Sequence, residues 1–193
     1  MKIYVALLFV VCCSLNAMQP EDATHSKQFI AVRDGDIENV EKLVNSENVN
    51  IRELFKLSES ESVDRYLLNF AAEQGNVEIV KLLLDKGAYI TAPDAYLFCQ
   101  LPYADIIYAV NRGTALDYAV ERGHTGVVCL LLARNADFNS VDRNGDTLLH
   151  KAARSGYLCI VQALLKKGAV ADLEKKNNKG DHPLHCAVRH GHE

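Results

Sequence analysis

The amino-acid sequence predicts an all-α solenoid of about five stacked helix-turn-helix units, joined by hairpin loops, of which the last is incomplete. Two regularities support this fold class. First, a glycine recurs along the chain with an alanine four residues before it. Second, a leucine-rich run follows the glycine by seven to nine residues in the units that extend that far, although the run is weak in the first unit. The glycines are Gly35, Gly75, Gly123, Gly156 and Gly191, and the alanines are Ala31, Ala71, Ala119, Ala152 and Ala187.

The first helix of each unit is expected to end at the recurring glycine. Glycine adopts the left-handed conformation that often terminates a helix, because it has no Cβ atom to clash there. The alanine lies about one turn earlier and is small enough to let neighbouring helices approach closely. Since a hairpin of two short helices cannot bury its apolar face alone, each unit is expected to pack against copies of itself.

The second helix of each unit is predicted from its leucine-rich run. In the fourth unit, Ile160, Val161, Leu164 and Leu165 form an apolar stripe at helical spacing. After the run, the second and fourth units have Gly87 and Gly168, and the third has Asn135. Asparagine is the other residue that commonly adopts the left-handed conformation after a helix. We therefore expect this conformation at all three positions.

One segment carries a family resemblance. Residues 142–174, DRNGDTLLHKAARSGYLCIVQALLKKGAVADLE, resemble an ankyrin repeat, whose signature is T-P-L-H-x-A on a period of about 33 residues. Residues 147–152 read TLLHKA, residues 182–187 read HPLHCA, and residues 114–119 read TALDYA. The resemblance implies an ankyrin repeat solenoid that binds other proteins. The structural motif residues are Thr114, Thr147, His150, Pro183 and His185, together with the helix-ending Gly75, Gly123 and Gly156.

The repeats define the expected domain boundaries. We expect a signal peptide at 1–17, a linker at 18–25 and an ankyrin repeat domain at 26–193. Two spacings between recurring glycines are longer than the others, and the first excess falls at residues 57–62, a serine and glutamate run that predicts a solvated loop. The units are expected at approximately 26–56, 65–91, 112–141, 145–174 and 180–193, with an insert at 92–111.

The N-terminal segment has the pattern of a secretory signal peptide. Lys2 precedes an apolar run from Ile3 to Cys13, and a polar stretch follows Ala17. The run is shorter than the roughly 20 apolar residues that a membrane span needs. We expect cleavage after Ala17 and a secreted or periplasmic chain with no membrane span after cleavage. A retained or lipid-anchored segment is the alternative.

The insert at 92–111 is the first candidate for partner binding, because insertions in repeat arrays map to loops that often form the binding face. It concentrates aromatic residues in a chain with no tryptophan. The alternative is that these aromatics fold back over the groove between the second and third units. The candidate contact residues are Asp94, Tyr96, Phe98 and Tyr103 around the insert, and Asp137 and Arg143 at a hairpin tip.

Composition argues against several other functions. The formal net charge is −4, and no basic stripe is present, so nucleic-acid binding is not expected. No H-E-x-x-H motif, glycine-rich phosphate loop or G-x-S-x-G motif occurs, and we expect no catalytic residue, cofactor or metal. Cys129, Cys159 and Cys186 are interpreted as buried free thiols in different units, and Cys99 in the insert as the most reactive thiol.

These observations predict a non-enzymatic, exported scaffold that binds a protein partner of unknown identity through hairpin tips, the groove face and the aromatic insert. The scaffold is expected to be a monomer. The first alternative is a targeting or substrate-recognition module of a larger or truncated multidomain protein, because the family would continue beyond Glu193 into a second helix. The second alternative is an exported metal- or small-molecule-binding protein that uses the histidines at 182–192.

Overall fold

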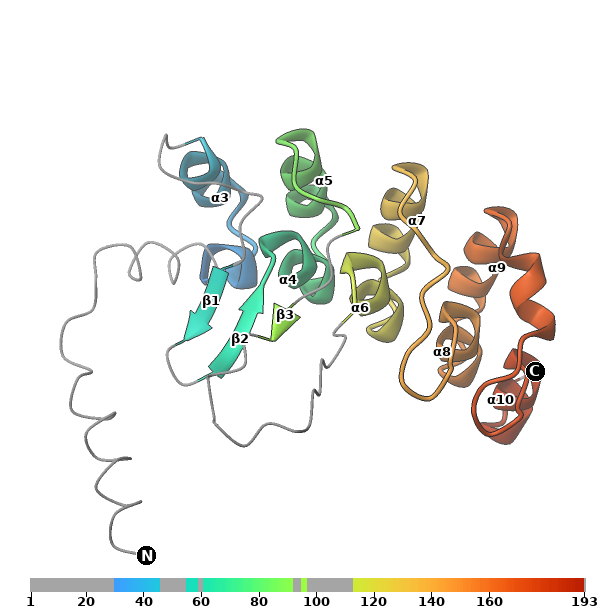
Figure 1. Ribbon diagram of the computed structural model, residues 1–193. Helices are drawn as coiled ribbons and strands as arrows, with labels where there is room; N and C mark the ends of the chain where they lie inside the picture. Colours follow the sequence, from blue (N-terminus) through green and yellow to red (C-terminus); the bar gives the residue numbers. More distant parts are fainter. Residues whose placement is uncertain (1–29, 46–54, 59–60, 92–94, 97–112, 193) are drawn as a thin grey trace, which may run out of the picture.

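Two parallel rows of short helices form the body of the molecule in the computed structural model (Figure 1). The structure describes residues 30–45, 55–58, 61–91, 95–96 and 113–192. The segments predicted as a signal peptide and a linker lie outside the described residues. The solenoid of stacked helix-turn-helix units is confirmed.

The first-helix row contains one helix from each of the five units, and in the described residues the second-helix row contains one from each of the first four. The first-helix row consists of residues 30–34, α4 (Leu67–Gln74), α6 (Ala115–Glu121), α8 (Leu148–Arg154) and α10 (Pro183–Arg189). The second-helix row consists of α3 (Ile37–Val44), α5 (Val77–Asp85), α7 (Thr125–Ala133) and α9 (Leu158–Lys166). A 3-10 helix, η1 (Ala169–Glu174), follows α9 and contacts α8, α9 and α10.

The helix ends follow the predicted pattern. The recurring glycines have positive φ values between 71° at Gly156 and 80° at Gly75. Gly87, Gly168 and Asn135 are also left-handed, with φ of 90°, 111° and 60°. A polar side chain caps two of the second helices, because Asp36 and Asn76 each accept a hydrogen bond at 3.0 Å from the backbone N–H three residues later.

The core lies between the two rows. The alanines of the first four units are buried, whereas Ala187 of the last unit is half-buried. The second helices α5, α7 and α9 contribute a β-branched pair followed by a leucine pair, as in Val127, Val128, Leu131 and Leu132 of α7, which are all buried. Neighbouring helices of the same row are in contact from α5 to α7 and from α7 to α9, so the core continues along the array.

A small antiparallel sheet accompanies the helices and was not part of the all-α prediction. Its strands are β1 (Phe55–Ser58), β2 (Glu61–Arg65) and β3 (Ala95–Tyr96), with β2 in the middle. The solvated loop expected at 57–62 is therefore wrong for 57–58 and 61–62, which belong to β1 and β2. Backbone pairing to β2 explains the difference, since a polar composition does not prevent a segment from forming ladder hydrogen bonds.

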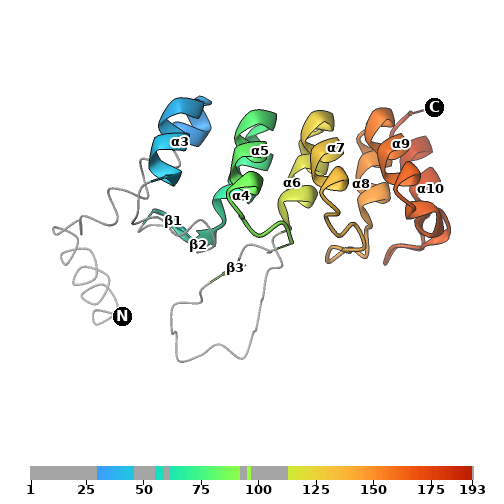
Figure 2. The ribbon, with the colours of Figure 1, turned by 90° about the horizontal axis from the view of Figure 1, so that it is seen from above.

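The two long spacings between glycines meet in this sheet. The hairpin of β1 and β2 comes from the first spacing, and β3 comes from the second. Figure 2 shows the strands and the hairpin loops projecting from the same side of the helical rows. The insert at 92–111 otherwise lies outside the described residues.

The cysteines differ from the expectation in their burial. Cys129, Cys159 and Cys186 are free, as expected, but only Cys186 is buried. Cys129 and Cys159 lie on the exposed side of α7 and α9, because the buried positions of each second helix are taken by the aliphatic pairs. Cys99 lies outside the described residues.

Candidate partner-binding surface

The hairpin tips at 142–146 and 177–181 have the same conformation. The first residue of each tip, Asp142 or Asn177, uses its side-chain oxygen to accept hydrogen bonds from the backbone N–H groups two and four residues later. The distances are 2.8 and 3.0 Å at Asp142 and 3.0 and 3.0 Å at Asn177. The glycine at the fourth position of each tip has positive φ. Both tips are therefore rigid turns stabilised from within.

Side chains and backbone join these two tips to each other. Asn177 Nδ2 donates to Asp146 Oδ1 at 2.7 Å. The backbone N–H of Asn178 donates to the carbonyl of Asn144 at 2.8 Å, and its side-chain amide donates to the carbonyl of Arg143 at 2.8 Å. The tips of the fourth and fifth units thus form one continuous surface whose shape is set before any partner binds.

Two ion pairs stand behind the joined tips. Arg154 pairs with the buried Asp146, and Arg189 pairs with Asp181 through two bonds of 2.5 and 2.8 Å. Burial of Asp146 opposes ionisation, but hydrogen bonds from Arg154 and Asn177 outweigh it and hold the pKa of Asp146 below its ordinary value. The hydrogen bond from Arg189 lowers the pKa of Asp181. A polar hollow of about 330 Å³ lies between these groups.

His150 links the fourth unit to the fifth by a hydrogen bond. Its side chain is fully buried, and Nδ1 accepts a hydrogen bond from the backbone N–H of Thr147 at 3.2 Å. Because Nδ1 accepts, the neutral ring carries its proton on Nε2, which donates to the carbonyl of Asp181 at 3.0 Å. The side chain of His150 therefore satisfies a backbone N–H at the start of α8 and links this helix to the next hairpin tip.

Asp117 occupies the equivalent position in the third unit and makes different links. Its Oδ2 accepts from the backbone N–H of Thr114 at 2.9 Å, as His150 Nδ1 does at Thr147. Its Oδ1 accepts from the hydroxyl of Ser140 at 3.0 Å and lies 3.6 Å from Lys151 Nζ. Lys151 also bonds to Glu121 at 2.7 Å. Burial would lower the pKa of Lys151, but Glu121 and Asp117 together raise it.

The residue after each recurring glycine packs on the glycine of the preceding unit. A Cβ atom at Gly75 would lie 2.5 Å from the ring of His124, and one at Gly156 would lie 2.6 Å from His192. Both rings also reach a carbonyl of the preceding unit through Nε2, at 2.9 Å for His124 and 3.1 Å for His192. Tyr157 lies against Gly123 in the same way. A larger residue at these positions would clash with a side chain of the next unit and would also be strained by the positive φ.

A model of the ankyrin repeat family, described as three copies of the repeat, matches residues 28–142 and 116–193. The chain belongs to the ankyrin repeat family. Ankyrin repeats generally mediate protein–protein interactions, and the family typically consists of non-enzymatic interaction modules.

Known proteins with ankyrin repeats are similar to this chain over most of its length. It is 31% identical over 145 residues to the ankyrin repeat and KH domain-containing protein mask-1 of Caenorhabditis elegans, covering 65% of the chain and 6% of that protein. It is 29% identical over 188 residues to the ankyrin repeat protein nuc-2 of Neurospora crassa, covering 86% of the chain and 17% of that protein. A third relative is the ankyrin repeat protein OPG189 of Variola virus, 26% identical over 187 residues, with 76% and 33% covered. The chain thus spans a third or less of the length of these relatives.

The residues of the ankyrin motif lie at the starts of the first helices. Thr114 and Thr147 precede α6 and α8, and Pro183 is the first residue of α10. His150 and His185 both accept a hydrogen bond through Nδ1 from the backbone N–H three residues earlier, at 3.2 Å. His185 is exposed, in contrast to His150.

The candidate contact residues are only partly described. Asp94, Phe98 and Tyr103 lie outside the described residues, and Tyr96 is the second residue of strand β3. Asp137 and Arg143 are both exposed. Asp137 accepts hydrogen bonds from Asn139, whose backbone N–H lowers the pKa of the carboxylate. The turn of this hairpin lies at 142–146, so Arg143 is at the tip and Asp137 is in the irregular segment between α7 and the turn.

Sequence reasoning missed the ion pairs behind the tips and the role of Lys151. A signal for the pairs was present, because in both of the last two units an aspartate stands eight residues before an arginine. Lys151 had no such signal. The equivalent residues in the second and third units are Phe70 and Tyr118, so its contacts with Glu121 and Asp117 depend on the stacking of the units.

Two negative findings apply to the described part of the chain. No group of three or more histidine, cysteine, aspartate or glutamate side chains is arranged there to hold a metal ion. None of its helices combines the length and the apolar character needed to cross a membrane.

Proposed function

We propose that this chain is a non-enzymatic ankyrin scaffold that binds a protein partner through its hairpin tips, the groove face of its first helices and the insert at 92–111. The observation that carries the proposal is the joined pair of tips at 142–146 and 177–181. Their turns are closed by internal hydrogen bonds and tied to each other by three more. A surface that is already ordered loses little conformational entropy when a partner binds.

The exposed groups of the joined tips supply polar contacts for a partner. Arg143 and Lys179 are exposed, one on each tip, and Asn178 lies between them with its amide fixed by the first tip. Behind them, Arg154 and Arg189 are each paired with an aspartate. Because each of these arginines is paired with an aspartate, a partner that covers the tips does not bury an unpaired arginine charge.

Site-specific crosslinking tests this surface. A photoreactive amino acid is placed at Arg143 or Lys179 on the tips of the full chain, and at Lys81 or Gln162 on the exposed side of α5 or α9 as matched controls. We expect the same partner to crosslink to both tip positions and to neither control position, as read by mass spectrometry of the crosslinked bands. Equal capture from the control positions would contradict the proposal.

The insert is proposed to extend the contact surface. β3 places the backbone of Tyr96 beside β2, on the side of the molecule from which the hairpin loops project (Figure 2). Replacing Tyr96, Phe98 and Tyr103 together by serine is expected to weaken binding of the crosslinked partner while the unfolding temperature changes little. An unchanged affinity would limit the contact surface to the tips and the groove face.

Export through residues 1–17 is part of the proposal. Lys2 and the apolar run that follows it support this step. Expression of the full chain, followed by N-terminal sequencing of the protein outside the cytoplasm, is expected to find cleavage after Ala17. Recovery of the whole chain from the cytoplasm with Met1 intact would contradict export.

A second candidate function is a targeting or substrate-recognition module of a larger protein. The observation that favours it is the small share of each relative that this chain spans, between 6% and 33% in the comparisons above. Immunoblotting of the source organism with an antibody against residues 113–192 distinguishes the two. A band much larger than the 21.4 kDa of this chain supports the second candidate.

A further inference from the structure

The polar hollow behind the joined tips lies at the joint between the fourth and fifth units. Its volume is about 330 Å³. Residues of both tips, of α8 and of α10 line it, so its walls belong to two units that pack on each other. One of the lining residues is Cys186, which is itself buried.

The hollow exists because the side chain of Cys186 is short. The residues at the same position in the second, third and fourth units are Phe70, Tyr118 and Lys151. Each of these side chains is longer than that of cysteine, which ends at Sγ. The space that a longer side chain would fill beside Cys186 is therefore left open.

The preceding joint shows what such a space can hold. Lys151 extends from the fourth unit toward the third, and its side chain is only 11% exposed. Its Nζ lies 2.7 Å from Glu121 and 3.6 Å from Asp117. The joint between the third and fourth units is thus filled by a cation that faces two carboxylates.

The joint that contains the hollow has walls of the opposite character. The residues equivalent to Asp117 and Glu121 are His150 and Arg154. The hydrogen bond to Asp146, supported by one to the thiol of Cys186, raises the pKa of Arg154 although burial opposes it. An acidic wall in one joint is therefore replaced by a basic wall in the next.

The hollow also has one more cation than anions. Its cations are Arg154, Lys179 and Arg189, and its anions are Asp146 and Asp181, with His190 counted as neutral. Each carboxylate is paired with an arginine. Lys179, by contrast, makes no ion pair with any residue that the structure describes. One carboxylate that entered the hollow would balance its charge.

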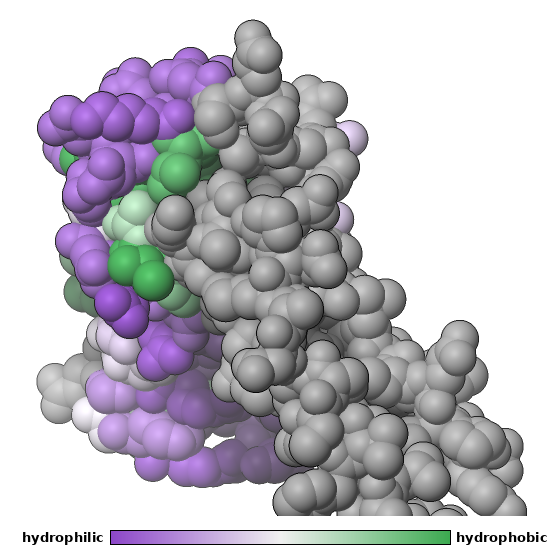
Figure 3. Space-filling model, turned by 90° about the vertical axis from the view of Figure 1, so that its left-hand side faces the viewer, coloured by the Kyte–Doolittle hydropathy of each residue, from purple (hydrophilic) through white to green (hydrophobic). Residues whose placement is uncertain are grey.

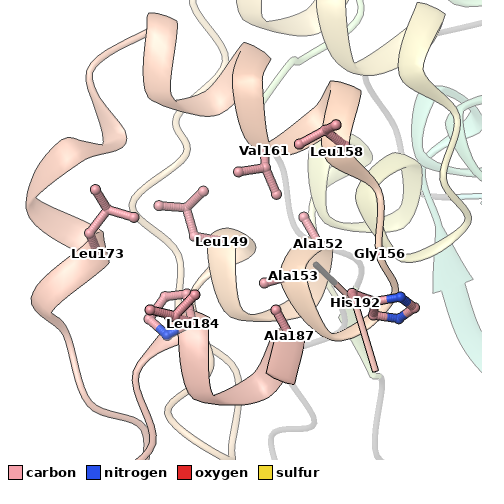
Figure 4. Close-up of a pocket in the computed structure, with 11 residues that line it drawn as sticks. Leu149, Ala152, Ala153, Gly156, Leu158, Val161, Leu173, Leu184, Ala187 and His192 are labelled. Carbon is pink, nitrogen blue, oxygen red and sulfur yellow. The ribbon is translucent and has the colours of Figure 1, made fainter. Parts of the chain in front are cut away.

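Hollows at the two ends of the described array have other linings. Figure 3 shows that the described residues at the N-terminal end are mostly hydrophilic around a small apolar area. The hollow there has both signs of charge, including Asp36 and Lys42, and all its residues come from one unit. Figure 4 shows the hollow at the other end, where Leu158 and Val161 of α9 lie opposite Leu184 of α10. Neither combines a charged lining with walls from two packed units.

We propose that the polar hollow binds the carboxylate of an acidic side chain of the partner protein, in the space that Lys151 fills in the preceding joint. Lys179 and the N–H groups of Arg154 that Asp146 and Cys186 leave unused hold this carboxylate. The proposal rests on the proposed function as a protein-binding scaffold, and it names the chemistry by which the joined tips recognise a partner.

A carboxylate attached to the chain itself tests the charge preference of the hollow. Cys186→Glu places a carboxylate there, and Cys186→Gln places a neutral side chain of the same size. We expect the glutamate variant to unfold about 2 to 4 °C above the glutamine variant at low salt, and the difference to decrease when Lys179→Ala is added. Equal unfolding temperatures of the two variants would overturn the proposal.

Lys151 provides the matched control for this comparison. Lys151 is the fourth residue of α8, as Cys186 is the fourth residue of α10, so the effect of the helix dipole is the same at both positions. Lys151→Glu is expected to unfold below Lys151→Gln, because the new carboxylate meets Asp117 and Glu121. The same order of stability at both positions would show that the helix, and not the hollow, prefers glutamate.

A tripeptide tests binding from solution. The probes are acetyl-Gly-Glu-Gly-amide and its glutamine counterpart, titrated into the full chain and followed by two-dimensional NMR. We expect weak, saturable shifts in the tips at 142–146 and 177–181 and in α8 and α10 with the glutamate peptide, and at least about tenfold weaker binding of the glutamine peptide. Cys186→Glu is expected to abolish the binding, because its own carboxylate occupies the hollow.

Two results of the titration overturn the proposal. Equal binding of the two peptides, or no binding of either, would exclude a site for an acidic side chain. A further titration uses glutarate, a free dicarboxylate that has no peptide backbone. Glutarate binding at least about tenfold tighter than the glutamate peptide would assign the hollow to a small molecule instead of a protein partner.

The partner captured by crosslinking at Arg143 links the hollow to the scaffold function. Cys186→Glu is expected to weaken its binding at least about tenfold, whereas Cys186→Gln should weaken it less. Capture at Arg143 with equal partner binding by both variants would remove the hollow from the contact surface and leave the scaffold function standing. Failure of capture, with selective binding of the glutamate peptide, would instead count against the scaffold function and leave the carboxylate site.

Discussion

The joint between the third and fourth units and the joint between the fourth and fifth units use the same stacking of helices but different chemistry. In the first joint, Asp117 and Glu121 face Lys151, so charged side chains carry the polar contacts. In the second joint, His150 and Asn177 make the polar contacts, and His150 donates its hydrogen bond to a backbone carbonyl. The apolar contacts of α6 with α8 and of α8 with α10 are common to both.

This difference shows which part of a repeat is free to vary. Both Asp117 and His150 satisfy the same need, an acceptor for the backbone N–H at the start of the first helix. The remaining atoms of each side chain are then available for a link to the next unit. The carboxylate of Asp117 pairs with a lysine and accepts from a hydroxyl, whereas the imidazole of His150 donates to a carbonyl. The joints are therefore expected to respond differently to mutation, salt and pH.

The largest effect is expected for His150→Ala. The substitution removes a fully buried ring, leaves the N–H of Thr147 and the carbonyl of Asp181 without their partner, and creates a cavity, so it should cost about 3 to 4 kcal/mol. His185→Ala is the matched control, because His185 has the same motif position but is exposed. It should cost less than about 1 kcal/mol. Urea unfolding measures both, and equal losses would mean that the link to the next unit contributes nothing.

The next effect concerns the glycines that both joints share. Gly123→Ala and Gly156→Ala should each destabilise the chain by about 2 to 3 kcal/mol, because the new methyl group meets Tyr157 or His192 in addition to the left-handed backbone. Gly180→Ala is the control. It has a φ of 80° but no atom within 4 Å of the added methyl, so only the backbone cost of about 1 kcal/mol applies. Similar unfolding midpoints for the three variants would exclude the packing contribution.

A smaller effect is expected for Lys151→Met, which removes the charge from the first joint and keeps most of the side-chain volume. The loss should be about 1 kcal/mol at low salt and should become smaller, without vanishing, in 1 M salt, because Glu121 is half-exposed and screened whereas Lys151 and Asp117 are nearly buried and screened less. The loss from His150→Ala should not depend on salt. Urea unfolding at two salt concentrations compares the two joints, and a salt-independent loss for Lys151→Met would contradict the ionic character of the first joint.

The smallest effect is expected from acid at Asp146. Its pKa is lower in the folded chain than in the unfolded chain, so its contribution to stability is present above the unfolded value of about 3.9 and is lost as the pH falls through the folded value. Asp146→Asn should therefore flatten the decline of the unfolding temperature below about pH 5. Glu78→Gln, at an exposed carboxylate of α5, is the control and should leave the decline unchanged. An equal decline in all three proteins would show that Asp146 does not contribute.

The helical framework could be predicted because its determinants are local. Gly75 or Gly156 ends a helix through its own backbone, and the stripe at Ile160 and Leu164 follows from helical periodicity. The motif histidine was expected to have a structural role because of its place in the ankyrin motif. The partner of its Nε2, the carbonyl of Asp181, depends on how two units stack and has no counterpart in a local pattern.

The remaining features could not be predicted because distant segments create them. The ladder between β2 and β3 joins residues on either side of α4 and α5. The serine and glutamate composition at 57–62 indicated a loop, since nothing local signals a pairing partner so far along the chain. Likewise, the exposure of Cys129 and Cys159 follows from which face of each second helix meets its neighbours in the row.

The small sheet changes how the array is expected to unfold. In a solenoid, each repeat touches only its neighbours, so end units can open one after another and the contacts are local in sequence. The pairing of β2 with β3 closes a loop of the chain around α4 and α5 through backbone hydrogen bonds, because the two strands lie before and after that unit. The second unit then cannot separate into its two helices without breaking the sheet as well. Hydrogen exchange is therefore expected to show α4 and α5 opening as one cooperative block with β2 and β3, while η1 and α10 exchange independently at the far end.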